Sequence, residues 1–229
     1  MNALVLIPAR GGSKGIPGKN IKHLNGIPLI HYTIIEALKS FSEEQIYISS
    51  DDDDILNCSM KVGKINPIKR PHHLSTDTSS SREVMLHALD YASKQGKQID
   101  AIILLQPTSP FRTSNHIDEA VKLFSEDVDM VVSVKNSDEN PYYSLFEENS
   151  LGYLSKSKKG NFTTRQDCPS VYAFNGAIYI LKVQSLIDSE ISEFKKIKKY
   201  LMTSLDSLDL DTPLDWKLAE LMMQERKIK

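Results

Sequence analysis

The chain has 229 residues, and its 28 Lys and Arg against 30 Asp and Glu give a formal net charge of −2. With 40% hydrophobic and 25% charged residues, it has the composition of a single folded domain with a sizeable core. The balanced charge argues against a general nucleic-acid-binding protein, and no apolar run approaches the roughly 18 residues that span a bilayer.

The N-terminus and the cysteine count favour a cytoplasmic protein. No basic region precedes the short apolar run at residues 3–7, which ends at Pro8, so we expect no secretory signal. Cys58 and Cys168 are too few for a disulfide framework or a four-cysteine metal site.

Short apolar runs alternate with segments of helical periodicity over the first 134 residues. This alternation predicts an α/β fold with a mostly parallel sheet flanked by helices, whose ligands bind at the carboxyl ends of the strands. We predict strands at 3–7, 45–49, 64–68, 101–105 and 130–134, and helices at 28–39, after 51–54, after 79–81 and at 114–125.

The composition then changes to a polar stretch with scattered aromatic residues at 135–169. This stretch is too long for an ordinary loop, so we predict a small inserted lobe or oligomerisation arm within one domain of residues 1–229. The sheet is expected to resume at 176–181 and the chain to end with a helix at 213–224.

A basic, glycine-rich loop, PARGGSKGIPGKN at residues 8–20, follows the first predicted strand. Glycines there allow backbone N–H groups to approach a phosphate, and Arg and Lys supply the counter-charge. The loop is not a Walker A motif, because Ser13 and Asn20 stand where that motif needs Gly and Ser or Thr. A flexible surface loop with solvated lysines is the alternative interpretation.

Acidic residues gather at the other end of the chain, where Asp209 and Asp211 form a D-x-D pair. In an extended segment the two side chains share one face and can chelate a hard cation such as Mg²⁺. Capping of the helix that begins at Pro213 is the alternative. Together, the basic loop, the carboxylate pair and the α/β sheet indicate a nucleoside triphosphate, Mg²⁺ and attack at a phosphorus atom.

Five motifs that occur in order carry a resemblance to a known family. They are LIPARGGSKGIPGKN (6–20), RP..L..DT.SS (70–81), LLQPTSPFR (104–112), FNGAIYI (174–180) and LDLDTPLD (208–215). Along essentially its whole length the chain resembles the acylneuraminate cytidylyltransferases, or CMP-sialic acid synthetases. The resemblance implies a Rossmann-like nucleotidyltransferase that joins CTP to the anomeric C2 hydroxyl of a 2-keto sugar acid and releases pyrophosphate.

The resemblance also implies roles for individual residues. The triphosphate would be bound by Arg10, Ser13, Lys14 and Lys19 with Asn20 beside them, and the nucleoside by Arg70 and the 77–81 segment, with Ser81 at the ribose. Gln106, Arg165 and Tyr179 match sugar-binding positions, and Asp209 and Asp211 match the Mg²⁺ ligands. Arg10, Lys14, Lys19 and Asp211 are the expected catalytic residues, and the 135–169 stretch corresponds to a lobe that forms a homodimer and reaches over the partner's active site.

Two departures from the family pattern lie on the sugar side. Ala173 stands where relatives often carry Arg before Asn-Gly-Ala, and Ser192-Glu193-Phe194 offers one aromatic residue where relatives that use N-acetylneuraminate can carry two. Besides an N-acylneuraminate, the acceptor alternatives are therefore legionaminate, pseudaminate, a deaminated nonulosonate and 3-deoxy-octulosonate. A non-catalytic nucleotide-binding regulator is the alternative from another class, and the retained carboxylate pair with Lys19 argues against it.

Overall fold

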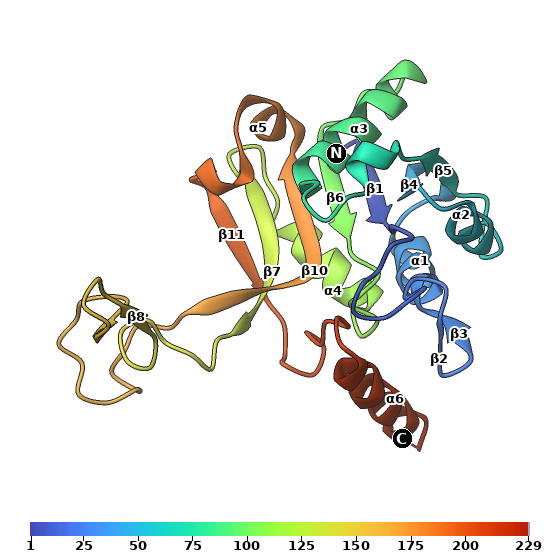
Figure 1. The fold of residues 1–229 in the computed structure, drawn as a ribbon. Coiled ribbons are helices and arrows are strands. Elements are labelled where there is room, and N and C mark those ends of the chain that lie inside the picture. The colour runs from blue at the N-terminus through green and yellow to red at the C-terminus, as the bar shows by residue number, and fades with distance from the viewer. Residues whose placement is uncertain (229) are drawn as a thin grey trace.

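A seven-stranded sheet in the order β11-β7-β10-β6-β1-β4-β5 forms the centre of the molecule (Figure 1). The computed structural model describes residues 1–228, with side chains described for residues 1–225. The strands are β1 (Ala3–Pro8), β4 (Ile46–Ser50), β5 (Asn66–Lys69), β6 (Ala101–Leu105), β7 (Met130–Asn136), β10 (Tyr172–Lys182) and β11 (Ile197–Leu201).

The sheet is parallel except at β10, which runs antiparallel to both β6 and β7. β1 pairs in parallel with β4 and β6, β4 with β5, and β11 with β7. The predicted α/β fold with a mostly parallel sheet is therefore confirmed, and its parallel strands present their carboxyl ends at one edge.

Helices cover both faces of the sheet, as the nearly continuous apolar strands require. On one face lie α1 (Leu29–Ser40), α2 (Asp53–Ser59) and α4 (Ser114–Lys122), and on the other lie α3 (Ser81–Lys94) and α5 (Val183–Asp188). Short 3₁₀ turns occupy Glu43–Gln45, His72–Leu74 and Ile191–Glu193. Along β1, Val5 and Ile7 pack into the first core, whereas Leu4 and Leu6 pack into the second.

A third, smaller core joins the end of the chain to its beginning. Here α6 (Pro213–Ile228) packs against the hairpin of β2 (His23–Leu24) and β3 (Ile27–Pro28), with Trp216 and Leu210 buried against Ile16 of the basic loop. The helix predicted at 213–224 is thus confirmed and extends to residue 228. In the described part of the chain, no helix is both long and apolar enough for a bilayer crossing.

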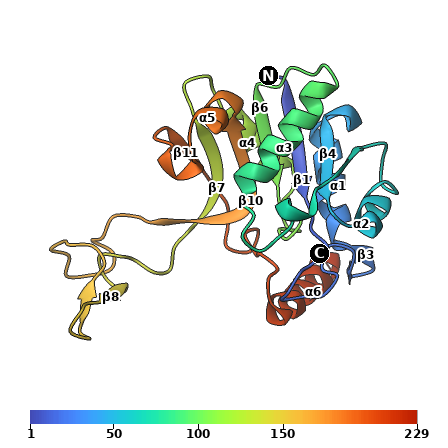
Figure 2. The same ribbon diagram turned by 45° about the horizontal axis from the view of Figure 1, so that its top comes forward.

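Residues 137–171 leave the body between β7 and β10 and project as an arm (Figures 1 and 2). Their regular structure is one hairpin, β8 (Phe146–Glu148) with β9 (Leu154–Lys156). Several apolar side chains of this hairpin are exposed, among them Leu151 at 78% and Tyr153 at 69%. The arm overlaps most of the polar stretch at 135–169, whose first two residues belong to β7.

Candidate active site

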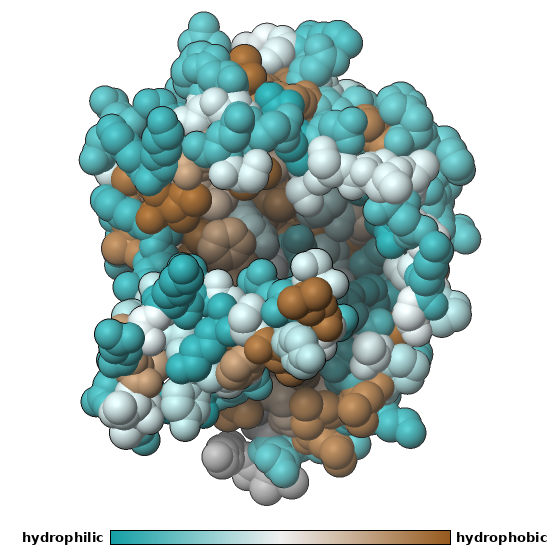
Figure 3. All heavy atoms as spheres, turned by 60° about the vertical axis from the view of Figure 1, so that its left-hand side comes forward, coloured by the Kyte–Doolittle hydropathy of each residue, from teal (hydrophilic) through white to brown (hydrophobic). Residues whose placement is uncertain are grey.

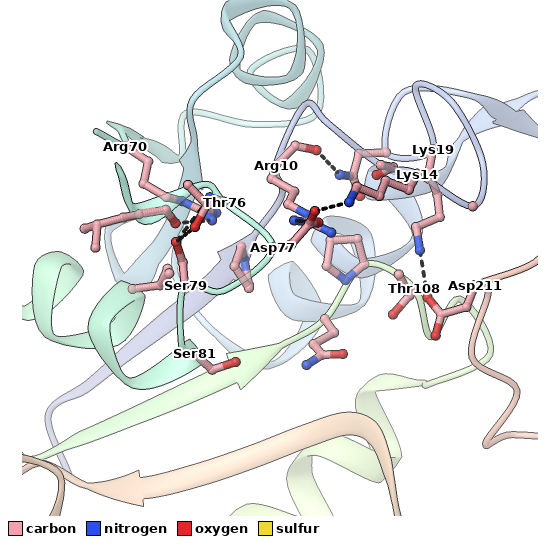
Figure 4. Close-up of a pocket in the computed structure, with 18 of the residues that line it drawn as sticks. Arg10, Lys14, Lys19, Arg70, Thr76, Asp77, Ser79, Ser81, Thr108 and Asp211 are labelled. Carbon is pink, nitrogen blue, oxygen red and sulfur yellow. Dashed lines mark hydrogen bonds and ion pairs between the residues drawn. The ribbon is translucent and has the colours of Figure 1, made fainter. Parts of the chain in front are cut away.

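A cavity of about 570 Å³ opens at the carboxyl edge of the sheet, and its lining comes from both ends of the chain (Figure 4). The molecule is visibly hollowed on the face from which the arm projects (Figure 3). The cavity brings together most of the residues predicted from the sequence. These are Arg10, Ser13, Lys14, Lys19, Asn20, Arg70, Ser81, Gln106, Asp209 and Asp211.

The first two cations of the basic loop converge on a carboxylate across the cavity. Arg10 Nη1 lies 2.7 Å from Asp77 Oδ1, and Lys14 Nζ pairs with the other oxygen of Asp77. The hydrogen bonds from Lys14 and Arg10 hold the pKa of Asp77 below its usual value. Asn20 shapes the loop, because its buried amide donates to the Arg10 carbonyl at 2.9 Å. Lys14 is 80% exposed, so it can exchange Asp77 for an incoming anion without disturbing the core.

The basic loop and the acidic C-terminal segment touch directly. Lys19 Nζ donates to the Leu210 carbonyl at 2.7 Å and lies 3.0 Å from Asp211 Oδ1. At Gly15 the two backbones pass so closely that a Cβ would lie 2.1 Å from the Asp211 carbonyl oxygen. Leu210 N–H also donates to the Thr108 carbonyl, so the segment is tied to the loop after β6 as well. Cations and carboxylates predicted as separate clusters therefore form one site.

Asp209 is the clearest metal-ligand candidate in this site. Its Oδ1 is buried and has no hydrogen-bond partner within the described part of the chain, and burial raises the pKa of the carboxyl above its usual value. Asp211, two residues on, is largely exposed to the cavity. No group of three His, Cys, Asp or Glu is placed to hold a metal among the residues described. Mg²⁺ fits this donor set, since it commonly takes one or two carboxylates and completes its shell with water and substrate phosphates.

Arg70 lines the cavity from the end of β5, but much of its guanidinium is already used. It donates to both Oγ and the carbonyl of Ser49 at the end of β4, and burial lowers its pKa to about 10, so it stays charged near neutrality. Beside it, Thr76 Oγ1 and Ser79 Oγ lie 2.8 Å apart. Ser81, the first residue of α3, completes a wall rich in hydroxyl groups.

A second cavity of about 470 Å³ adjoins the first and shares Gln106 and Asp209 with it. The predicted residue Tyr179 lines this second cavity. Its shape depends on an irregularity of β10, whose pairing with β7 shifts register between Phe174 and Tyr179. Gly176, at φ +76°, lies inside this bulge, and a Cβ there would sit 3.0 Å from Gln106 Oε1. The bulge therefore turns β10 toward the loop after β6.

Arg165 is the one predicted site residue that a single chain does not bring to either of these cavities. It lies in the arm, where its Nη2 is 3.7 Å from Asp138 Oδ1. A separate depression in the arm contains it together with Cys168.

Two residues that support the site were not among those predicted. Arg112 is 1% exposed and donates to the carbonyls of Gln106 and Ala177 at 3.0 and 2.8 Å and to Thr33 Oγ1. It thereby fixes the loop after β6 relative to β10, and burial lowers its pKa to about 9. Asn175 is buried, accepts from Ser133 Oγ and donates to Ser207 Oγ at 2.8 Å. Both lie within recognised motifs, but their residue types alone do not reveal a buried role.

Comparison with known proteins places the chain among cytidylyltransferases. The family model described as "Cytidylyltransferase" matches residues 4–228. The chain is 36% identical to post-translational flagellin modification protein B of Campylobacter coli over 99% of this chain and 97% of that protein. It is 33% identical to CMP-N,N′-diacetyllegionaminic acid synthase of Legionella pneumophila, covering 98% of this chain and 97% of the relative.

Two other matches either cover only part of the relative's length or have low sequence identity. An N-acylneuraminate cytidylyltransferase of Streptococcus agalactiae is 35% identical over 94% of this chain but only 52% of its own length. Among solved structures, CMP:2-keto-3-deoxy-manno-octonic acid synthetase complexed with CTP superposes with a TM-score of 0.70 at 19% identity, covering 98% and 100% of the two chains. That structural similarity supports the α/β fold with its mostly parallel seven-stranded sheet.

Proposed function

Because the chain belongs to the cytidylyltransferase family, we propose that it transfers CMP from CTP to the anomeric C2 hydroxyl of a nine-carbon 2-keto sugar acid, releasing pyrophosphate. The observation that carries this proposal is the direct contact of the basic loop with the acidic segment, made by Lys19 and Gly15 at the edge of one cavity. A triphosphate needs cations and a metal at the same place, and this contact supplies residues for both.

The phosphates occupy the basic loop. Arg10 and Lys14 exchange Asp77 for phosphate oxygens, while backbone N–H groups of the glycine-rich turn add donors. The acceptor hydroxyl loses its proton and its oxygen attacks the α-phosphorus, as the bond to the pyrophosphate oxygen breaks on the opposite side. Rate acceleration then comes from positioning and from charge neutralisation, with no covalent intermediate on the enzyme.

Asp209 and Asp211 would hold Mg²⁺ between the basic loop and the acceptor site. The unpartnered Oδ1 of Asp209 supports this assignment, because a buried carboxylate oxygen without a donor is costly unless a ligand satisfies it. When bound, Mg²⁺ supplies Lewis-acid polarisation of the α-phosphate. Lys19, bonded to Asp211, holds this carboxylate near the phosphates.

The nucleoside and the sugar take opposite sides of the joined cavities. Arg70 and Ser81 line the first cavity and suit cytosine and ribose, whereas Tyr179 lines the second and suits the sugar acid. Gln106 lines both, so it lies where the reacting groups meet.

For the acceptor we favour N,N′-diacetyllegionaminate. A relative named for that sugar matches over 97% of its length, whereas the neuraminate relative is matched over 52%. The sequence agrees, since Ser192-Glu193-Phe194 offers one aromatic residue where relatives that use N-acetylneuraminate can carry two, and Ala173 departs from the Arg that relatives often carry.

A pyrophosphate-release assay tests the proposal. It crosses CTP, ATP, GTP and UTP with N,N′-diacetyllegionaminate, N-acetylneuraminate, pseudaminate and 3-deoxy-octulosonate, each with and without Mg²⁺. We expect release only with CTP and Mg²⁺, and fastest with N,N′-diacetyllegionaminate. CTP binding without pyrophosphate release in the presence of any acceptor would contradict the proposal and indicate a nucleotide-binding regulator.

A further inference from the structure

Lys135 is the only cation among the described residues that line the second cavity. The other ionised groups of that lining are the carboxylates Asp209 and Asp215. No carboxylate of the described residues pairs with Lys135, so its charge is not already neutralised within that part of the chain.

The strand pairing explains why this lysine reaches the cavity. Lys135 lies in β7 directly opposite Ala173 of β10, whose small side chain leaves space beside it. Ser133, two residues earlier on the same face of β7, donates to the Asn175 side chain. The face of β7 that carries Ser133 and Lys135 therefore lies against the bulge of β10 that shapes the cavity.

A 2-keto sugar acid carries its carboxylate on the carbon next to the reacting C2 hydroxyl. As that hydroxyl approaches Asp209, the acceptor's carboxylate enters a space that already contains two carboxylates. Repulsion between these negative charges opposes binding of the acceptor. A charge-assisted hydrogen bond from an ammonium group to the acceptor's carboxylate offsets this repulsion.

We propose that Lys135 binds the carboxylate of the acceptor and thereby selects sugar acids over uncharged sugars. This inference rests on the proposed function and adds the residue that recognises the acid group.

The test compares wild type with K135M and K135R, and with K122M as a matched control. Lys122 is an exposed lysine in α4 that lines neither cavity. With CTP and Mg²⁺, pyrophosphate release is measured for N,N′-diacetyllegionaminate and N-acetylneuraminate and for the methyl ester of each. We expect K135M to lose roughly 10- to 100-fold in kcat/KM for the acids, through a higher KM, as for loss of a charge-assisted hydrogen bond.

The esters separate charge recognition from structural damage. In K135M the rate with each ester and the KM for CTP should stay within about two-fold of wild type, K135R should retain most of the preference for acids, and K122M should match wild type. Equal losses for acid and ester, or unchanged kinetics in K135M, would overturn the role of Lys135 while leaving the proposed function standing. If wild type turned over none of the sugars, the proposed function would fail and this inference with it.

Discussion

At Gly15 the basic loop and the C-terminal segment approach each other more closely than any side chain permits. An added Cβ would lie 2.1 Å from the Asp211 carbonyl oxygen, and that atom belongs to backbone that cannot move aside cheaply. We therefore expect Gly15→Ala to lower the free energy of unfolding by about 2 kcal/mol and to raise the KM for CTP at least several-fold. Gly12→Ala is the control for the unfolding measurement, because a methyl group there would meet nothing within 4 Å among the described residues. Chemical denaturation of both variants and the KM for CTP of Gly15→Ala test the prediction, and equal free energies of unfolding for the two variants would contradict it.

We expect the Asp209 carboxylate to lower the stability of the metal-free protein and to be required for pyrophosphate release. Burial raises its pKa, so the folded chain binds that proton more tightly than the unfolded chain, and the ionised carboxylate opposes folding at neutral pH. In metal-free buffer Asp209→Asn should therefore raise the melting temperature at pH 7. The gain should vanish as the pH falls below the ordinary carboxyl pKa, where Asp209 is protonated in both states. Pyrophosphate release should drop by about 10²-fold or more in the same variant. A lower melting temperature at pH 7 would show that the carboxylate stabilises the metal-free fold.

At the residue scale, candidate site residues can be predicted from the sequence where residue type and neighbours reveal chemistry. Arg10, Lys14 and Lys19 are conspicuous because they stand among glycines without acids. Lys135 and Arg112 could not be singled out in this way, because pairing between distant strands brings Lys135 to the second cavity and complete burial surrounds Arg112 with its partners.

At the scale of elements, one buried amide adds a tie between the sheet and the segment that joins β11 to α6. Asn175 receives a hydrogen bond from Ser133 in β7 and donates one to Ser207, so it ties the acidic segment to the sheet. Asn175→Ala should cost about 1–3 kcal/mol of unfolding free energy, because the partners of the lost amide stay buried. It should also weaken Mg²⁺-dependent turnover by moving Asp209. Asn57→Ala, on the exposed side of α2, provides the comparison. An unchanged Mg²⁺ dependence of kcat in Asn175→Ala would show that the hydrogen bonds of Asn175 do not position Asp209.

Most elements were predicted from hydrophobic periodicity, and the exceptions have physical causes. β11 was missed because it is an edge strand with Lys198 and Lys199 exposed, so it lacks the apolar run of a central strand. The antiparallel direction of β10 was not predicted either, since a buried strand has the same apolar pattern in both directions.

At the scale of the whole molecule, we propose that the arm completes the site of a second copy in a homodimer. The exposed apolar side chains of its hairpin support this arrangement, as does the position of Arg165 in a depression of the arm that is separate from the two cavities of its own chain. If Arg165 acts across the dimer, Arg165→Ala and Asp211→Asn should each be nearly inactive alone. A 1:1 mixture of the two variants should recover about a quarter of wild-type activity, because about half of its dimers are heterodimers and each of these holds one intact site of two. The two variants are refolded together so that their subunits exchange. A mixture no more active than either variant alone would contradict the proposal.

The contact between Lys19 and Leu210 joins residues 191 positions apart. During synthesis the phosphate loop therefore emerges long before the carboxylates that lie against it, and the nascent chain can pair β1 with β4 and β6 while this contact is still open. Because closing so long a stretch of chain is slow, we expect assembly of the site to be a late event in folding. Unfinished chains would then carry cations able to attract nucleotides without the acids needed to act on them.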